Sequence, residues 1–134
     1  MIDLKIQRAE WTTEAARFLS PSLKRTPMIA ITDYQNALES DPVNCGLYRI
    51  TQNGAPVLYC IVRVEHYSHG AEGVILAAGG RSKLDLTENC LALVEKMFHG
   101  VSGFRVTTAR RGLIRKLERQ GYTVTHYVLK KAAK

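Results

Sequence analysis

The sequence predicts a single α/β domain of the α+β type, in which a mixed, mostly antiparallel central sheet of about six strands has about four helices packed on it. The first supporting observation is the length, since 134 residues is the usual size of one domain with its own hydrophobic core. The second is the order of elements, because strand patterns follow one another in the middle of the chain and then alternate with helix patterns. We therefore expect one domain spanning residues 1–134.

The N-terminal part predicts one strand followed by two short helices. Residues 2–6 alternate apolar and polar side chains, which is the period of a half-buried strand. A first helix is expected behind Thr12 as its N-cap, and Pro21 ends the pattern. A second helix is expected over about residues 33–40, where Thr32 and Gln35 have the spacing of a capping box.

The middle of the chain predicts a hairpin and a central strand. The dipeptide Asn53-Gly54 joins two β-rich runs, residues 46–52 and 56–64, and adopts positive φ at little cost. A polar loop is expected over residues 66–72. The apolar run 73–78 shows no alternation, so it predicts a strand that is buried on both faces and lies inside the sheet.

The last third predicts two further strand and helix pairs. Asp85 and Glu88 have capping-box spacing at the start of a helix whose apolar face continues to about residue 97. Residues 104–108 predict a strand, and residues 110–120 predict a basic helix that ends at Gly121 as its C-cap glycine. Residues 122–129 then predict a closing strand.

Nothing in the sequence points to a membrane or to an oxidising compartment. The N-terminus lacks the apolar run of a signal peptide, and no apolar run is long enough to cross a bilayer. The three cysteines, Cys45, Cys60 and Cys90, are odd in number and have no metal-binding spacing, which favours buried thiols. We therefore expect a cytoplasmic protein without a membrane partner.

Positive charge is concentrated at one end of the chain. The net charge is +7, and residues 104–134 contain nine Lys or Arg residues and one acid, Glu118. Such a surface favours phosphate-bearing partners, which include nucleic acid and nucleotide cofactors, or an acidic protein face. The candidate residues for binding nucleic acid or a partner protein are Arg110, Arg111, Arg115, Lys116 and Arg119. A solvated helix face is the alternative explanation.

The element order and the stretch from Gly103 to Tyr122 resemble the Gcn5-related N-acetyltransferase (GNAT) superfamily, in which a fifth strand, a helix ending in a Gly-aromatic pair and a closing strand follow one another. Within it, residues 109–117 resemble the tail of GNAT-like proteins of tailed phages and prophages. The resemblance implies a fold that holds the pyrophosphate of acetyl-coenzyme A at the start of its main helix. The implied cofactor-binding residues are Ala78, Gly79, Gly80, Arg81, Ser82 and Lys83.

The sequence also departs from that family. When the family's phosphate-binding pattern is anchored on Arg81, Leu84 and Leu86 occupy positions that require small residues. The position of the family's tyrosine acid falls on Leu117, which cannot donate a proton. For the general base, the candidates are Glu65 and Glu72 at the strand ends. An ordinary strand-to-helix turn and solvated strand-end charges are the alternatives.

Other catalytic classes find little support. His66 and His69 form the only close histidine pair, but zinc needs three or four ligands and no third stands at a supporting spacing. We expect no metal. The sequence has no Gly-x-Ser-x-Gly elbow and no phosphate-binding P-loop, so serine hydrolase and phosphoryl-transfer functions are excluded.

Three functional hypotheses follow. The first is a catalytically degenerate, phage or prophage-type GNAT-fold protein without a cofactor, which acts as a binding or assembly domain in the host cytoplasm or in the virion. The second is an N-acetyltransferase that uses acetyl-coenzyme A and acts on an unknown amine. A structure in which the fourth and fifth strands separate and leave an open slot would favour this enzyme, and a slot filled by side chains would oppose it. The third is a nucleic-acid or host-protein binding module that uses the basic helix. All three hypotheses are compatible with an oligomer.

Overall fold

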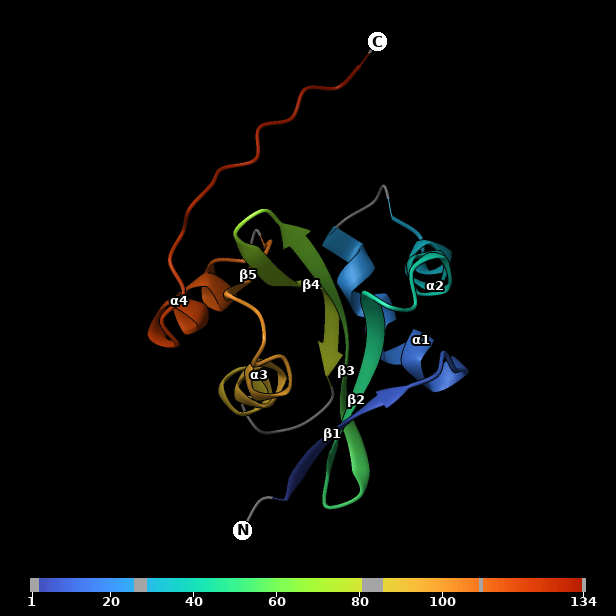
Figure 1. Ribbon diagram of the computed structural model, residues 1–134. Helices are drawn as coiled ribbons and strands as arrows, with labels where there is room; N and C mark the ends of the chain where they lie inside the picture. The colour runs from blue at the N-terminus through green and yellow to red at the C-terminus, as the bar shows by residue number, and fades with distance from the viewer. Residues whose placement is uncertain (1–2, 26–28, 81–85, 109, 134) are drawn as a thin grey trace.

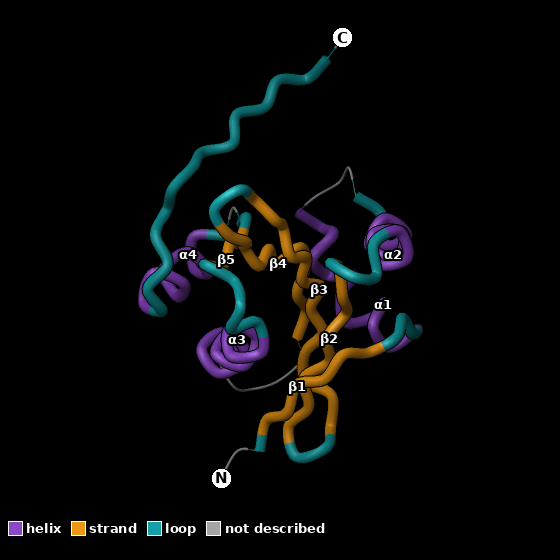
Figure 2. Tube along the Cα trace, in the orientation of Figure 1, coloured by secondary structure: helices purple, strands orange, loops and turns teal. Residues whose placement is uncertain are grey.

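The sheet has five strands, and helices cover both of its faces (Figures 1 and 2). The computed structural model describes residues 3–25, 29–80, 86–108 and 110–133. The strands are β1 (Leu4–Ala9), β2 (Cys45–Gln52), β3 (Ala55–Tyr67), β4 (Gly70–Gly80) and β5 (Gly103–Val106). The helices are α1 (Thr13–Leu19), the 3₁₀ helix η1 (Ser20–Arg25), α2 (Ile31–Ser40), α3 (Leu86–Met97) and α4 (Arg111–Arg119). Among the described residues, no helix is long and apolar enough to cross a membrane.

The strands are arranged in the order of the sequence, β1-β2-β3-β4-β5. Strands β1 to β4 pair antiparallel, and β5 pairs parallel to β4. The predicted α+β architecture with a mixed, mostly antiparallel sheet is therefore confirmed. The apolar run 73–78 lies in β4, and its residues 73–75 pair with both β3 and β5, as the lack of alternation indicated. The expected burial on both faces does not extend to Ala78, which is exposed.

Turn chemistry determines the hairpin between β2 and β3. Asn53 has φ 51° and Gly54 has φ 87°, which are the positive values that this two-residue turn requires. The polar loop expected over residues 66–72 was wrong, because β3 continues to Tyr67 and β4 already begins at Gly70. Polar residues fit these strand ends because the side chains there are partly or fully exposed.

The helix caps match the sequence in one case and differ in another. The Thr12 hydroxyl accepts a hydrogen bond from the Ala15 amide at 3.1 Å, as expected of an N-cap. In α2 the predicted Thr32 cap was wrong. The helix begins earlier, at Ile31. The amide of the N-cap residue Ala30 donates a hydrogen bond to the Asp33 carboxylate at 2.8 Å, which satisfies a backbone donor at the start of the helix.

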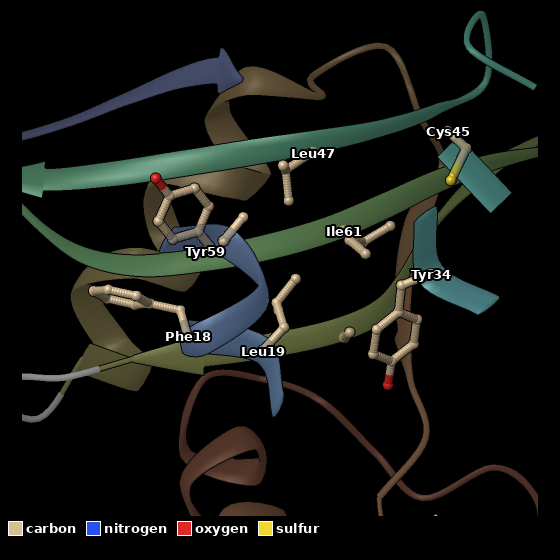
Figure 3. Close-up of a cluster of buried hydrophobic side chains, with 9 residues drawn as sticks. Phe18, Leu19, Tyr34, Cys45, Leu47, Tyr59 and Ile61 are labelled. Carbon is tan, nitrogen blue, oxygen red and sulfur yellow. The ribbon is translucent and has the colours of Figure 1, made fainter. Parts of the chain in front are cut away.

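Two hydrophobic cores form, one on each face of the sheet. The first lies between the sheet and helices α1 and α2 and includes Phe18, Leu47 and Ile61 (Figure 3). The second lies under α3 and includes Ile50 and Val62. All three cysteines are free and buried, and burial raises the pKa of Cys60 to about 12 and that of Cys90 to about 11. These thiols are therefore protonated core residues at neutral pH.

The end of α4 is shaped by one glycine. Gly121 has φ +94°, its amide donates to the Glu118 carbonyl, and the Tyr122 amide donates to the Leu117 carbonyl, each at 3.1 Å. These two bonds form a Schellman cap, so Gly121 is the C-cap glycine that the sequence predicted. The closing strand expected over residues 122–129 was wrong, because this segment is extended but pairs with no strand among the described residues.

Helix α1 lies directly on the backbone of β4. A Cβ atom placed on Gly79 would lie 2.8 Å from the carbonyl carbon of Phe18 and even closer to its oxygen. Because both of these atoms belong to backbone, neither can rotate away. Position 79 therefore excludes every residue with a side chain as long as α1 keeps its place.

Replacement of Gly79 with alanine is expected to lower the free energy of unfolding by about 1–3 kcal/mol, since overpacking against backbone forces a shift. Gly112→Ala is the matched control, because a Cβ there meets nothing within 4 Å. It should cause no loss and can add up to about 1 kcal/mol by helix propensity. Urea denaturation of both variants checks this, and equal stability of the two would contradict the packing of α1 on β4.

Candidate functional site

Strand β4 contains a β-bulge at Leu76. Ala77 is opposite Ile61 and Ile75 is opposite Val62, so the pairing skips Leu76 and leaves it without a partner on β3. A bulge bends the strand and increases its local twist, and bulges often end pairing next to functional sites. The hydrophobic run around Leu76 conceals this feature in the sequence, and no residue there signals it.

Pairing between β4 and β5 stops at the same place. The last pair is Ile75 with Val106, whereas β4 continues for five more residues to Gly80. In the described part of the chain, no strand lies beside residues 76–80 on the side of β5. We call this stretch of β4 the free edge. Its outward backbone N–H and C=O groups have no ladder partner and need one from water or a ligand.

Small residues make the free edge accessible. After Leu76 it consists of Ala77, Ala78, Gly79 and Gly80, none with a side chain larger than a methyl group. Ala78 is exposed, although Cys60 directly opposite it on β3 is only 2% exposed. Helix α3 therefore covers β3 at this level and leaves β4 uncovered.

The structure brings together only part of the predicted cofactor-binding set. Ala78, Gly79 and Gly80 lie at the end of β4, on the free edge. The remaining candidates, Arg81, Ser82 and Lys83, lie outside the described residues, as does Leu84. Leu86 is the first residue of α3. The requirement for glycine at position 79 is explained by the contact with α1, so this residue type alone is not evidence for a phosphate site.

The two candidate bases lie side by side at the other end of β4. Glu65 and Glu72 are directly opposite each other on β3 and β4. Arg105 of β5 donates from Nη2 to Glu65 Oε2 at 2.6 Å, and its Nε lies 3.9 Å from Glu72 Oε1. The Tyr67 hydroxyl also donates to Glu65 Oε2, at 2.6 Å. Sequence reasoning did not identify Arg105 and Tyr67, since partners on neighbouring strands emerge only with the register.

The two carboxylates differ in how strongly they are held. The hydrogen bond from Tyr67 and the charge of Arg105 lower the pKa of Glu65 below its ordinary value. A carboxylate stabilised in this way is a weak base. Within the described ranges, Glu72 forms only the longer ion pair with Arg105, and its side chain is 39% exposed. The Glu72 carboxylate is therefore the less restrained of the two.

The site is spread along one strand. Glu72 precedes Ala78 by six residues, which corresponds to about 20 Å along β4. Beside Glu72, an open hollow of about 630 Å³ lies at the turn between β3 and β4 and is lined by residues 66–72 and Ser102. The carboxylate pair can attract a cationic amine, while the free edge can bind an extended ligand through backbone hydrogen bonds.

The position that the resemblance assigns to an acid has no polar group. Leu117 is the residue of α4 that is buried, with 7% of its surface exposed. The nearby Tyr122 hydroxyl donates to Glu95 of α3 at 3.2 Å, and burial together with this carboxylate raises its pKa. Tyr122 therefore secures α4 against α3.

Three arginines form a row on α4. Arg111, Arg115 and Arg119 are four residues apart, so they share one helix face, and all are exposed. We call them the arginine row; none has a salt bridge to another described residue. Of the other predicted basic residues, Arg110 is the N-cap and Lys116 is partly buried.

The histidine pair does not form a metal centre with other described residues. The His66 ring contacts the Asn44 side-chain oxygen at 3.0 Å. Across the described ranges, no three His, Cys, Asp or Glu side chains gather closely enough to hold a metal ion.

Changing Tyr67 to Phe should raise the pKa of Glu65 towards its ordinary value, because the strongest stabiliser of the carboxylate is removed. Because the pKa of Glu65 is lower in the folded than in the unfolded state, this carboxylate stabilises the folded protein at pH values above its unfolded-state pKa. That stabilisation is lost as the pH falls through the folded-state pKa. Carboxyl-detected NMR titration measures the pKa directly. Tyr34→Phe, on α2, is the control; an unchanged Glu65 pKa in the Tyr67 variant would contradict the assignment.

No family model matches the sequence. No curated protein matches it either. Solved structures with a similar fold do match this chain. A possible acetyltransferase from Clostridium difficile 630 has TM-score 0.71 and 15% identity over 98% of this chain and 97% of that chain. A transcriptional regulator from Bacillus halodurans C-125 has TM-score 0.70 and 16% identity over 98% and 100%. A GCN5-related N-acetyltransferase from Ralstonia eutropha JMP134 has TM-score 0.67 and 14% identity over 100% of both chains. The protein therefore has the fold of the GNAT acetyltransferases.

Proposed function

We propose that the protein binds an acyl-coenzyme A along the free edge of β4 and transfers the acyl group to an amine. The observation that carries this proposal is the bulge at Leu76, where β4 loses its pairing with β5. The loss of pairing between these two strands agrees with the separation that the sequence analysis expected to favour an enzyme. Acetyltransferases among the structures of similar fold support the same function.

The residues present fit the extended arm of coenzyme A. This arm contains amide groups, which can pair with the backbone of a strand edge much as a peptide does in β-augmentation. The alanines and glycines of residues 77–80 let the ligand approach the backbone closely. The same residues leave Ala78 exposed beside α3, so the ligand has room on that face of the sheet.

The carboxylate pair serves the second substrate. When bound, the thioester supplies an activated acyl carbon. In this proposal Glu72 and Glu65 attract a cationic amine to the start of β4, and Glu72 would act as its base once the amine reaches the acyl group. Leu117 offers no proton to a leaving thiolate. Catalysis therefore rests mainly on holding the two substrates in place, which can supply a large part of a rate enhancement.

Isothermal titration with acetyl-coenzyme A should show binding with a Kd in the micromolar range. Ala78→Trp should weaken binding by at least about tenfold, or about 1.4 kcal/mol, because the indole fills the exposed space beside the free edge. Ala55→Trp is the matched control, since Ala55 is also an exposed strand alanine but lies at the hairpin turn. An absence of heat with the unmodified protein would refute the proposed site.

Transfer is then followed by release of free thiol in the presence of amines. Turnover on any amine would establish the acyltransferase. Binding without turnover would instead support a protein that keeps the cofactor site and has lost the transfer reaction. That outcome would agree with the lack of a proton donor at Leu117.

A second candidate is a non-catalytic binding domain of phage or prophage type that uses the arginine row for nucleic acid or for an acidic protein. Like charges four residues apart on a helix destabilise it by a few tenths of a kcal/mol per pair. A polyanion would relieve this repulsion by neutralising the row. One protein of similar fold is named a transcriptional regulator, which supports a binding role for a chain with this fold.

Replacement of all three residues of the arginine row with glutamate should weaken binding of duplex DNA. The slope of the logarithm of the binding constant against the logarithm of salt concentration should fall in magnitude by about one per lost phosphate contact. A variant with the same total charge but an intact row is the control, with glutamate at Lys5, Lys24 and Lys131. Fluorescence anisotropy at several salt concentrations measures both effects. Equal losses in the two variants would show that only net charge matters.

A further inference from the structure

The C-terminal segment extends away from the rest of the molecule. After Gly121 the chain leaves α4 and runs outwards without returning to the sheet, as Figures 1 and 2 show. We call residues 123–133 the tail. Its large apolar side chains are exposed, with Val124 at 55%, Val128 at 68%, Tyr127 at 88% and Leu129 at 93%. Apolar surface of this extent on a monomer commonly marks an interaction site.

The tail has the sequence of a buried strand. Of the eight residues from Tyr122 to Leu129, six are β-branched or aromatic, which is a strong preference for strand. In an extended chain, Val124 and Val128 point to one face, and Tyr127 and Leu129 to the other. A strand that is apolar on both faces belongs between two covering layers.

The sheet has a matching vacancy at β5. This strand is an edge of the sheet, and its outer side has no strand partner within the described residues. Unpaired strand edges readily accept another strand, unless charge, proline or a covering element protects them. The only charged residue of β5 is Arg105, whose guanidinium is engaged by Glu65.

We propose that the tail of one copy pairs with the β5 edge of a second copy, and that the exchange is reciprocal. Each chain carries one unpaired strand and one unpaired edge, so two copies related by a two-fold axis satisfy both and leave neither exposed. A different protein partner would use only one of the two features. A second copy is therefore the occupant that the structure favours.

The exchange buries the apolar side chains of the tail and adds a sixth strand to each sheet. This accounts for the strand that the sequence predicts over residues 122–129 and that the isolated chain does not form. The lysines at 130 and 131 follow directly, and charged residues commonly mark the end of such a segment. The proposal does not depend on acyl-coenzyme A binding, because the tail and the free edge are separate features.

Light scattering after size exclusion should give the full chain a mass of about twice its 15.0 kDa. The double substitution Tyr127→Pro and Val128→Pro removes adjacent backbone donors, so it interrupts pairing whichever edge of the tail is used. The dimer Kd should then rise by at least about tenfold (about 1.4 kcal/mol). The control places prolines at Lys131 and Ala132, beyond the predicted strand, and should leave the dimer intact.

Hydrogen exchange completes the test. Amides of residues 123–129 should exchange slowly in the dimer and fast in the Tyr127 and Val128 proline variant, while those of β3 stay protected and show that the body is folded. A monomeric full chain overturns the proposal, whether its tail is free or folded back on its own β5. A dimer that persists in the proline variant overturns it as well. If that variant fails to fold, Tyr127→Lys with Leu129→Lys replaces it, with the same expected dissociation.

Discussion

Strand β4 is longer by one residue than the stretch of β3 with which it pairs, and the surplus falls on Leu76. Contacts on both sides of Leu76 help to hold the register of the strand. Gly79 lies against the backbone of α1, and the start of the strand is joined to β3 and β5 through Glu65, Glu72 and Arg105. Pairing between β4 and β5 ends next to this bulge, and the free edge that forms the proposed cofactor site begins there.

This arrangement separates two tasks along one strand. Before the bulge, β4 is paired on both sides and supports charged side chains whose positions are set by hydrogen bonds. After the bulge, it offers backbone and almost no side chain. The proposed site would need few distinctive residues, because backbone groups would bind the ligand and the fold would position them. Leu117 occupies the position at which the resemblance places a polar acid, and the fold forms without that acid.

Local chemistry made much of the fold predictable. Asn53-Gly54, Thr12 and Gly121 each act within a few residues, and each is found in its expected role. Features that depend on register were not predictable: the bulge at Leu76 and the ion pairs of Arg105 arise only when strands far apart in sequence are aligned. The segment after Gly121 is a third case. Its strand propensity is visible in the local sequence, but a stable strand also needs a pairing partner, which the local sequence does not specify. For the candidate site, sequence resemblance indicated the end of β4, and only the structure showed why that edge is free.

The most direct test of the central claim is to follow backbone amide signals by NMR while acetyl-coenzyme A is added. The account predicts that the largest shifts fall on Ala77, Ala78, Gly79 and Gly80, and that slower hydrogen exchange appears at the same amides. Signals of β1 and of the β2–β3 hairpin should remain in place. Shifts confined to α4, or none at saturating ligand, would contradict the claim that the free edge of β4 is a cofactor site.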